Sequence, residues 1–346
     1  MTTPTSETLR LDRDRLADAV VSRLTTAGTL SSEARNQCLE DTRQHLDYLA
    51  HAVASEDPEI FIAHLRWAKI VHVALNRNVD ALAAQFHALQ QVLHDTLGSS
   101  PAEDYLASAL AQLPQMPTEL PSFLNNNDAL DTLANDYLAL LLNGDRNAAS
   151  QLILENVERG VAVRDLYLRV FQPAQYEVGR LWQLNQITVA QEHFCTAATQ
   201  LIMSQLYANI FSTTRVGLKL VATAVSGDLH EVGIRMIADF FEMEGWDTLY
   251  LGSNLPTESV IATLRSEQPD LLAISATLTP HVHHVHQLIA AIRRQADIAH
   301  TRIIVGGYPF SATPRLWQHV GADATASDAQ AAVEIGTTLV PSKACA

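Results

Sequence analysis

The feature that most constrains the fold is a change of sequence pattern at residue 217. Beyond it, short apolar runs rich in β-branched residues alternate with stretches of helical periodicity. The expected strands are 218–225, 247–252, 270–275, 302–307 and 322–325, and the expected helices are 231–244, a stretch after Pro256, 282–296, a stretch around 312–318 and the C-terminal segment. Because strands that alternate with helices form right-handed βαβ units, residues 216–342 are predicted to form a doubly wound, parallel, five-stranded α/β domain.

Helical regions are expected before this domain. The amphipathic stretches of the N-terminal part are 41–53, 59–75 and 78–97. They predict an N-terminal all-α domain over residues 1–120, which ends in the proline-rich linker 113–123. Residues 128–212 contain about four more amphipathic segments joined by short turns, which predicts a four-helix bundle.

The composition excludes several classes of function. The chain has 23 Lys and Arg against 38 Asp and Glu, a formal net charge of −15. It has no basic cluster suited to phosphates, so we expect no direct nucleic-acid binding. It lacks an apolar run of about 18 residues or a signal-peptide pattern, so we expect no membrane span and a cytoplasmic location. Its 3 cysteines are widely spaced and form no disulfide framework.

The first expected strand leads into Asp228, His230 and Gly233. A neutral imidazole is a good ligand for a transition metal, and a carboxylate two residues earlier can accept the proton of its other nitrogen. A glycine lets the backbone approach a bulky group. The alternative from these residues alone is a helix N-cap beside an exposed histidine.

Two further motifs stand at the expected spacing. Ser275 follows Gly233 with 41 residues between them, and Gly306-Gly307 follow Leu278 with 27 between. The set resembles the Rossmann-like (flavodoxin-like) cobalamin-binding domains of methionine synthases, mutases and corrinoid proteins. The resemblance implies that His230 displaces the dimethylbenzimidazole base and ligates the cobalt from below, oriented by Asp228. It also implies a slot for the nucleotide tail.

The residues that the resemblance assigns to this slot are Ser275, Leu278, Gly306 and Gly307. One departure is visible, because the family's Ser-x-Leu has Thr277 at its leucine position and leucine follows at 278.

The predicted bundle carries Trp182, nine further residues, and then Glu192-His193. This signature resembles that of adenosylcobalamin-dependent photoreceptors, and it implies that these three residues cover the adenosyl group. A tryptophan can stack on adenine, and a carboxylate can accept hydrogen bonds from ribose. The alternative is a core aromatic and a favourable charge at a helix start. Well-known members have histidine directly after the tryptophan, where this chain has Gln183.

The N-terminal region loosely resembles globin-like sensor modules, and the chain is similar to photocobilins, which hold a bilin beside the corrin. The residues able to serve a tetrapyrrole such as biliverdin are His51, His64, Arg66, Trp67, His72 and His87. The alternative is a plain dimerisation or partner-binding bundle. The histidines of 281–286 are solvated or at the cofactor edge, or they bind a metal.

These resemblances imply an adenosylcobalamin-binding light sensor that signals by a change of oligomer or partner binding. The similarity to photocobilins implies a bilin such as biliverdin as a second chromophore. It would be a homo-oligomer and not an enzyme, with an unknown protein partner. The alternatives are a corrinoid methyl carrier of a methyltransferase system, or a regulator that senses cobalamin without light.

Overall fold

The structure is a computed structural model, and it describes residues 4–27, 31–210 and 214–340. It divides into two compact units, Met1–Leu120 and Pro121–Ala346, which are described separately. No helix in the described ranges combines the length and the apolar character needed to cross a lipid bilayer.

The N-terminal unit is all helical, as predicted. Its elements are α1 Pro4–Leu11, α2 Arg13–Ala27, α3 Ser32–Ala54, α4 Glu59–Ala74, α5 Val79–Leu97, α6 Pro101–Gln112 and the 3₁₀ turn Leu113–Gln115. Ser31 and Asn78 cap α3 and α5 with their side chains, and Pro101 occupies the first turn of α6. The apolar faces of these helices form one core around residues such as Leu49, Phe61 and Phe86.

The C-terminal unit begins with the predicted bundle. Its elements are α7 Ala129–Leu142, α8 Arg146–Glu158, α9 Val163–Leu166, the π-helical turn Tyr167–Phe171, α10 Gln172–Gln183, α11 Val189–Gln205 and the short α12 Tyr207–Ile210. The π turn stands directly before the start of α10, where Pro173 has no N–H for the α-helical ladder.

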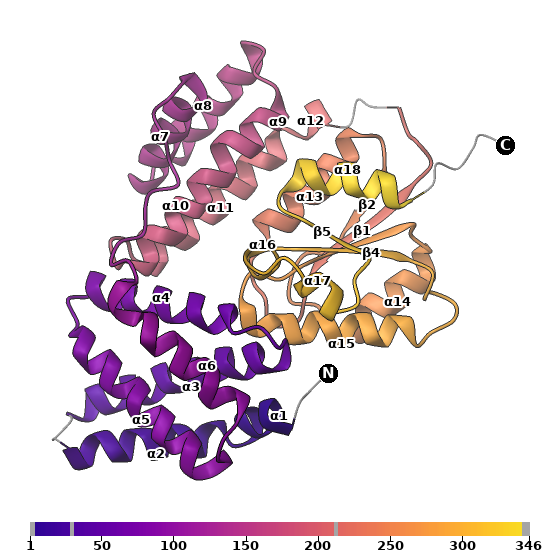
Figure 1. The fold of residues 1–346 in the computed structure, drawn as a ribbon. Helices are drawn as coiled ribbons and strands as arrows, with labels where there is room; N and C mark the ends of the chain where they lie inside the picture. Colours follow the sequence, from indigo (N-terminus) through magenta and orange to yellow (C-terminus); the bar gives the residue numbers. More distant parts are fainter. Residues whose placement is uncertain (1–3, 28–30, 211–213, 341–346) are drawn as a thin grey trace. The chain divides into compact units, whose positions relative to one another are not determined.

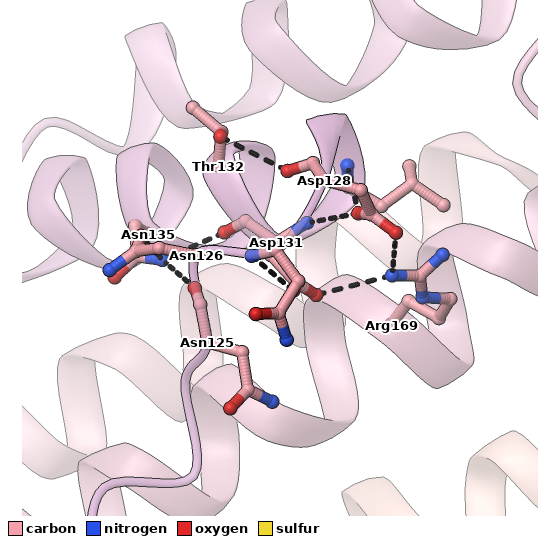
Figure 2. Close-up of polar contacts among 9 residues, drawn as sticks. Asn125, Asn126, Asp128, Asp131, Thr132, Asn135 and Arg169 are labelled. Carbon is pink, nitrogen blue, oxygen red and sulfur yellow. Dashed lines mark hydrogen bonds and ion pairs between the residues drawn. The ribbon is translucent and has the colours of Figure 1, made fainter.

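Polar contacts fix the start of α7 (Figure 2). Asp128 caps the helix by accepting a hydrogen bond from the N–H of Asp131, and Arg169 pairs with both carboxylates, at 2.6 Å and 3.2 Å. Asn135 donates to the carbonyl oxygen of Asn125 at 2.8 Å. The segment that leads into the bundle is therefore held against α7.

Five strands form the predicted parallel sheet (Figure 1). They are β1 Lys219–Ala224, β2 Asp247–Tyr250, β3 Leu271–Ser275, β4 Arg302–Gly306 and β5 Ala324–Ala326, in the order β2-β1-β3-β4-β5. One face packs against α13 Val232–Met243 and α18 Ala329–Leu339, and the other packs against α14 Thr257–Glu267 and α15 Val282–Arg293. Strands with apolar residues on both faces are typical of such a sheet.

Several predicted boundaries differ from the structure: the helix expected over 282–296 ends at Arg293, and the strand expected over 247–252 ends at Tyr250. The helix expected around 312–318 is two short helices, α16 Tyr308–Ala312 and α17 Leu316–His319, because Pro314 interrupts the helical ladder between them. The last strand lies at Ala324–Ala326, where 322–325 was expected.

The bundle and the sheet share one hydrophobic core, which runs from Leu133 of α7 to Phe240 of α13 and Val333 of α18. The separate boundaries 128–212 and 216–342 therefore stay predictions, and both include residues outside the described ranges. The two layers are also joined where the Tyr167 hydroxyl donates to Asp239 at 2.9 Å.

Candidate functional site

The carboxyl edge of the sheet gathers the predicted residues. In the parallel register, Ala224 of β1 pairs with Ser275 of β3, and Ser275 pairs with Gly306 of β4. The loop that carries His230 leaves β1 at this edge, directly before α13. Ligands of doubly wound sheets bind beyond this edge, so the predicted lower-face residues are brought together where a ligand would lie.

Asp228 and His230 form the predicted pair. His230 Nδ1 lies 2.7 Å from Asp228 Oδ1, and the His230 backbone N–H donates to the same oxygen at 3.0 Å. The Asp228 side chain is 0% exposed, whereas that of His230 is 55% exposed. The carboxylate therefore holds Nδ1 from within the fold and leaves Nε2 available to a ligand.

The charges of this pair reinforce one another. The hydrogen bond to Asp228 raises the pKa of His230, partial burial opposes this rise, and the charges of Asp228 and Glu192 add to it. Burial alone would raise the pKa of Asp228, but hydrogen bonds from His230 and the Thr277 amide, together with the nearby His281 imidazole, bring it well below its ordinary value. Asp228 is thus an ionised acceptor that makes the imidazole a more basic ligand.

Gly307 and Gly233 differ in how much space surrounds them. A Cβ at Gly307, where φ is +106°, would lie 2.0 Å from the Ala276 carbonyl oxygen, so the fold itself requires glycine there. A Cβ at Gly233, in the first turn of α13, would meet nothing within 4 Å. Glycine at 233 therefore leaves open space beside His230, which fits the approach of a bulky ligand.

Large apolar side chains stand exposed after three adjacent strands. Leu229 follows β1, Leu278 follows β3 and Tyr308 follows β4, with exposed fractions of 71%, 43% and 64%. Burying such groups is favourable, so they fit a broad ligand with apolar faces such as a corrin. Leu278 was predicted to be at the site, whereas Leu229 and Tyr308 were missed, because only the strand order places them at one edge.

Helix α11 connects the bundle to this edge. Gln200 of α11 donates to Glu231, the residue after His230, at 3.3 Å, and its carbonyl oxygen accepts from Arg235 of α13 at 3.1 Å. The negative charge of Glu192, in the first turn of α11, contributes to the raised pKa of His230. The bundle therefore faces the loop that carries the predicted cobalt ligand.

The residues predicted to cover the upper face lie at the ends of two helices. Trp182, 47% exposed, is in the last turn of α10; Glu192 is in the first turn of α11, and His193 follows it. Thr188 and Gln191 form the expected capping box of α11. Glu192 accepts a hydrogen bond from Thr196 at 3.1 Å and pairs with His193 at 3.3 Å. Their contact with an adenosyl group stays a prediction.

One histidine of 281–286 contacts Asp228, which was not predicted. His281 Nδ1 lies 3.5 Å from the second oxygen of Asp228, and its side chain is 17% exposed, so His281 is not simply solvated. Within the described ranges, no group of three or more His, Cys, Asp or Glu side chains is arranged to hold a bare metal ion. One imidazole is enough for a cobalt that a corrin already holds.

The tetrapyrrole candidates of the N-terminal unit do not share one environment. His64 is 3% exposed, stacks on Tyr48 at 3.9 Å and lies 2.8 Å from Nδ1 of the buried His45, which was missed. Burial lowers the pKa of His64 to about 3. Arg66 and His87 lie at the surface. Burial therefore keeps His45 and His64 as neutral core groups, and the candidate His51 is buried as well.

Comparisons with known proteins match two parts of the chain to B12 binding domains. Residues 218–334 match a family described as B12 binding domain, and residues 133–207 match a second family with the same description. Monomethylamine corrinoid protein 1 of Methanosarcina acetivorans is 23% identical over 62% of this chain and 99% of its own length. Corrinoid protein DSY3155 of Desulfitobacterium hafniense is 22% identical over 60% of this chain and 98% of its own length.

A solved structure agrees in fold. The monomethylamine corrinoid protein of Methanosarcina barkeri is 20% identical, covers 61% of this chain and 100% of its own, and superposes with a TM-score of 0.55. Over residues 133–207 and 218–334, the chain thus belongs to the cobalamin-binding protein family.

Proposed function

We propose that the chain is a corrinoid carrier: it holds a cobalamin in the base-off form, with His230 below the cobalt, and offers the upper alkyl group to a partner. The observation that carries this is the 2.7 Å contact between the buried Asp228 and the exposed imidazole of His230. When bound, a corrinoid supplies a cobalt–carbon bond whose alkyl group can be transferred or released.

The residues of the site would divide this work. Asp228 fixes the tautomer of His230, so that Nε2 is the free nitrogen. The open space beside Gly233 admits the macrocycle, and the exposed Leu229 and Tyr308 give it apolar surface. Helix α11 of the bundle contacts the loop that carries His230, because Gln200 donates a hydrogen bond to Glu231. Together these features hold and orient a cofactor and leave the reaction itself to a partner.

The methyl-carrier function is favoured by the comparisons. The relatives quoted above are named corrinoid proteins, and nearly the whole length of each is matched by this chain. We propose that this chain acts in the same way, with a separate methyltransferase as its partner, and that it is not an enzyme by itself.

A second function is favoured by the bundle residues. Trp182 is half exposed, and the charge of Glu192 reaches His230, which supports an adenosylcobalamin-dependent light sensor. In that case Trp182 and Glu192 hold the adenosyl group, and its release on illumination changes the packing of the bundle and the oligomeric state. Gln183 then provides no imidazole after Trp182. A bilin would be an additional chromophore.

One purification separates these functions. The full chain is produced with cobalamin and biliverdin supplied, purified in the dark, and its corrinoid is extracted and identified by mass spectrometry. Absorption spectra and elution volumes are then recorded before and after green light. A methyl corrinoid whose methyl group passes to a thiol or to tetrahydrofolate when a methyltransferase is added supports the carrier.

The other outcomes are equally distinct. An adenosyl corrinoid whose spectrum and elution volume both change in light supports the sensor and contradicts the carrier. A response to added cobalamin without any response to light supports a light-independent regulator. The variant His230→Ala tests the shared basis, and unchanged affinity and colour in this variant would refute all three functions.

A further inference from the structure

One arginine of α13 reaches across to the bundle. Arg235 stands one helical turn after Glu231, and one of its guanidinium nitrogens donates to the backbone carbonyl oxygen of Gln200 at 3.1 Å. Another donates to Ser204 Oγ at 2.7 Å. The same guanidinium lies 5.3 Å from the ring centre of Tyr207, in α12. Arg235 therefore joins α13 to the C-terminal part of α11 and to the short helix that follows it.

The chemistry of this contact suits the end of a helix. Helix α11 ends at Gln205, so Gln200 and Ser204 lie in its last turns. Carbonyl groups at the end of a helix carry a partial negative charge, which favours a guanidinium there. Because a guanidinium presents its N–H groups in a rigid planar fork, two acceptors one turn apart fix its direction. Arg235 thus holds one turn of α11 in a defined orientation.

A second contact holds the same turn. The side-chain amide of Gln200 donates to Glu231 at 3.3 Å, and Glu231 also accepts from Ser253, in the loop after β2, at 3.3 Å. Glu231 and Arg235 are four residues apart, so they lie on the same face of α13. That face therefore holds Gln200 both by its backbone and by its side chain.

Apolar packing by itself does not fix the rotation of α11 about its axis. Ile202 and Met203 of this helix are buried in the core that the bundle shares with the sheet, but such contacts are non-directional. Hydrogen bonds are directional. Gln200, Thr196 and Glu192 follow one another at intervals of four residues, so they share one face of α11. Holding Gln200 therefore also decides where Glu192 points, two turns away.

The cover of the site consists of Trp182, Glu192 and His193, the residues predicted to lie over the upper face. We propose that Arg235 is a positioning residue for this cover: by holding the turn of α11 that contains Gln200, it orients the Glu192 end of the helix toward the carboxyl edge of the sheet. This proposal rests on the proposed function, in which a corrinoid lies at that edge. Arg235 acts only through α11.

The contact is also of a kind that can open. The hydrogen bond between Arg235 and Ser204 lies at the protein surface, where water can replace it at little net cost. A carrier has to cover its alkyl group and then expose it to a partner. A surface hydrogen bond that exchanges for water suits this change.

The test uses four substitutions in the full chain. Arg235→Met removes the charge and the hydrogen bonds, whereas Arg235→Lys keeps the charge and loses the fork. Ser204→Ala removes one acceptor from the bundle side. Arg265→Met is the matched control, because it removes an arginine of α14, which packs on the other face of the sheet and pairs there with Asp297. Thermal melts of the apo proteins report whether each variant folds.

Two readouts follow the cover without any enzymatic assay. The first is amide hydrogen exchange of the apo protein by mass spectrometry, over α11 and α12, with α7 as the internal reference. The second is the rate at which azide or glutathione replaces the upper water of bound aquocobalamin, followed in the visible spectrum. Azide is small and glutathione is a bulky tripeptide, so the glutathione rate reports how far the upper face is open.

We expect Arg235→Met to speed hydrogen exchange in α11 and to raise the glutathione rate about 10-fold, the factor that one charged hydrogen bond contributes. The azide rate should rise by less than about threefold, because a small anion needs less room. Ser204→Ala should raise the glutathione rate about threefold, and Arg235→Lys should lie between Arg235→Met and the wild type. Arg265→Met should stay within about twofold of the wild type in both readouts.

The possible failures are distinct. Wild-type hydrogen exchange and wild-type rates in folded Arg235→Met would overturn the role of Arg235, and so would an equal increase in Arg265→Met. If Arg235→Met does not fold, a Ser204→Ala variant that exchanges and reacts like the wild type would overturn it as well. A wild-type chain that takes up no cobalamin would overturn the proposed function itself, and hydrogen exchange of the apo protein would still decide whether Arg235 holds α11.

Discussion

Asp239 in α13 should limit the stability of the C-terminal unit above neutral pH. It lies between the sheet and the bundle, 6% exposed, and accepts a hydrogen bond from Tyr167 at 2.9 Å. Burial raises the pKa of Asp239 from 3.8 to about 6, even though Tyr167 and the positive charge of Arg235 favour the ionised form. The folded state therefore holds this proton more tightly than the unfolded state does.

The sign and size of the effect follow from this difference. Where the folded state binds the proton more tightly, stability falls as the pH rises, here from about 4 to about 6. The full cost above that range is about 3 kcal/mol, at 1.36 kcal/mol per pKa unit. The substitution Asp239→Asn removes the charge and keeps an oxygen that can accept from Tyr167. It should raise the free energy of unfolding by up to about 3 kcal/mol at pH 8 and by only about 1 kcal/mol at pH 4.5.

Urea denaturation followed by tryptophan fluorescence measures this difference. In a Trp67→Phe background, the remaining tryptophans, Trp182, Trp246 and Trp317, all lie in the C-terminal unit. Asp247→Asn, at an exposed position of β2, is the matched control and should change stability by less than about 0.5 kcal/mol at either pH. A gain in Asp239→Asn that does not depend on pH, or a loss of stability at pH 8, would refute the reasoning.

Two further substitutions test the backbone of the site. Gly307→Ala should lower the free energy of unfolding by more than about 2 kcal/mol, because its Cβ would collide with the Ala276 carbonyl oxygen. The control Gly144→Ala is also at positive φ but has no heavy atom within 4 Å of the added Cβ, so it should cost only about 1–2 kcal/mol. Equal losses of stability in the two variants would argue against the collision. Thr188→Ala removes the capping box of α11 and should lower the free energy of unfolding by about 1 kcal/mol, measured in thermal melts. Thr188→Ser should retain most of this stability. An alanine variant as stable as the wild type would show that the cap contributes nothing to stability.

Most of the elements could be predicted from the sequence because their signals are local. Strand-length apolar runs, helical periodicity, the Thr188 cap and the proline-rich linker each depend on neighbouring residues, and the order of strands and helices follows from them. The closeness of Asp228 to His230 is local in the same sense, because two residues of one loop can reach each other whatever the rest of the fold does. The prediction of one helix around 312–318 was wrong, because it overlooked that Pro314 separates two short helices there.

The contacts between loops were decided only by the tertiary structure. His281 reaches Asp228 because β3 lies beside β1 in the sheet, and no local pattern states which strands are neighbours. For the same reason Leu229 and Tyr308 became site residues only once β1, β3 and β4 were aligned at one edge. The sequence by itself therefore indicated a corrinoid as the ligand and predicted His230 as the residue that meets it. Packing between distant segments decided which side chains lie near that histidine, because contacts across a sheet depend on strand order and register rather than on residue type.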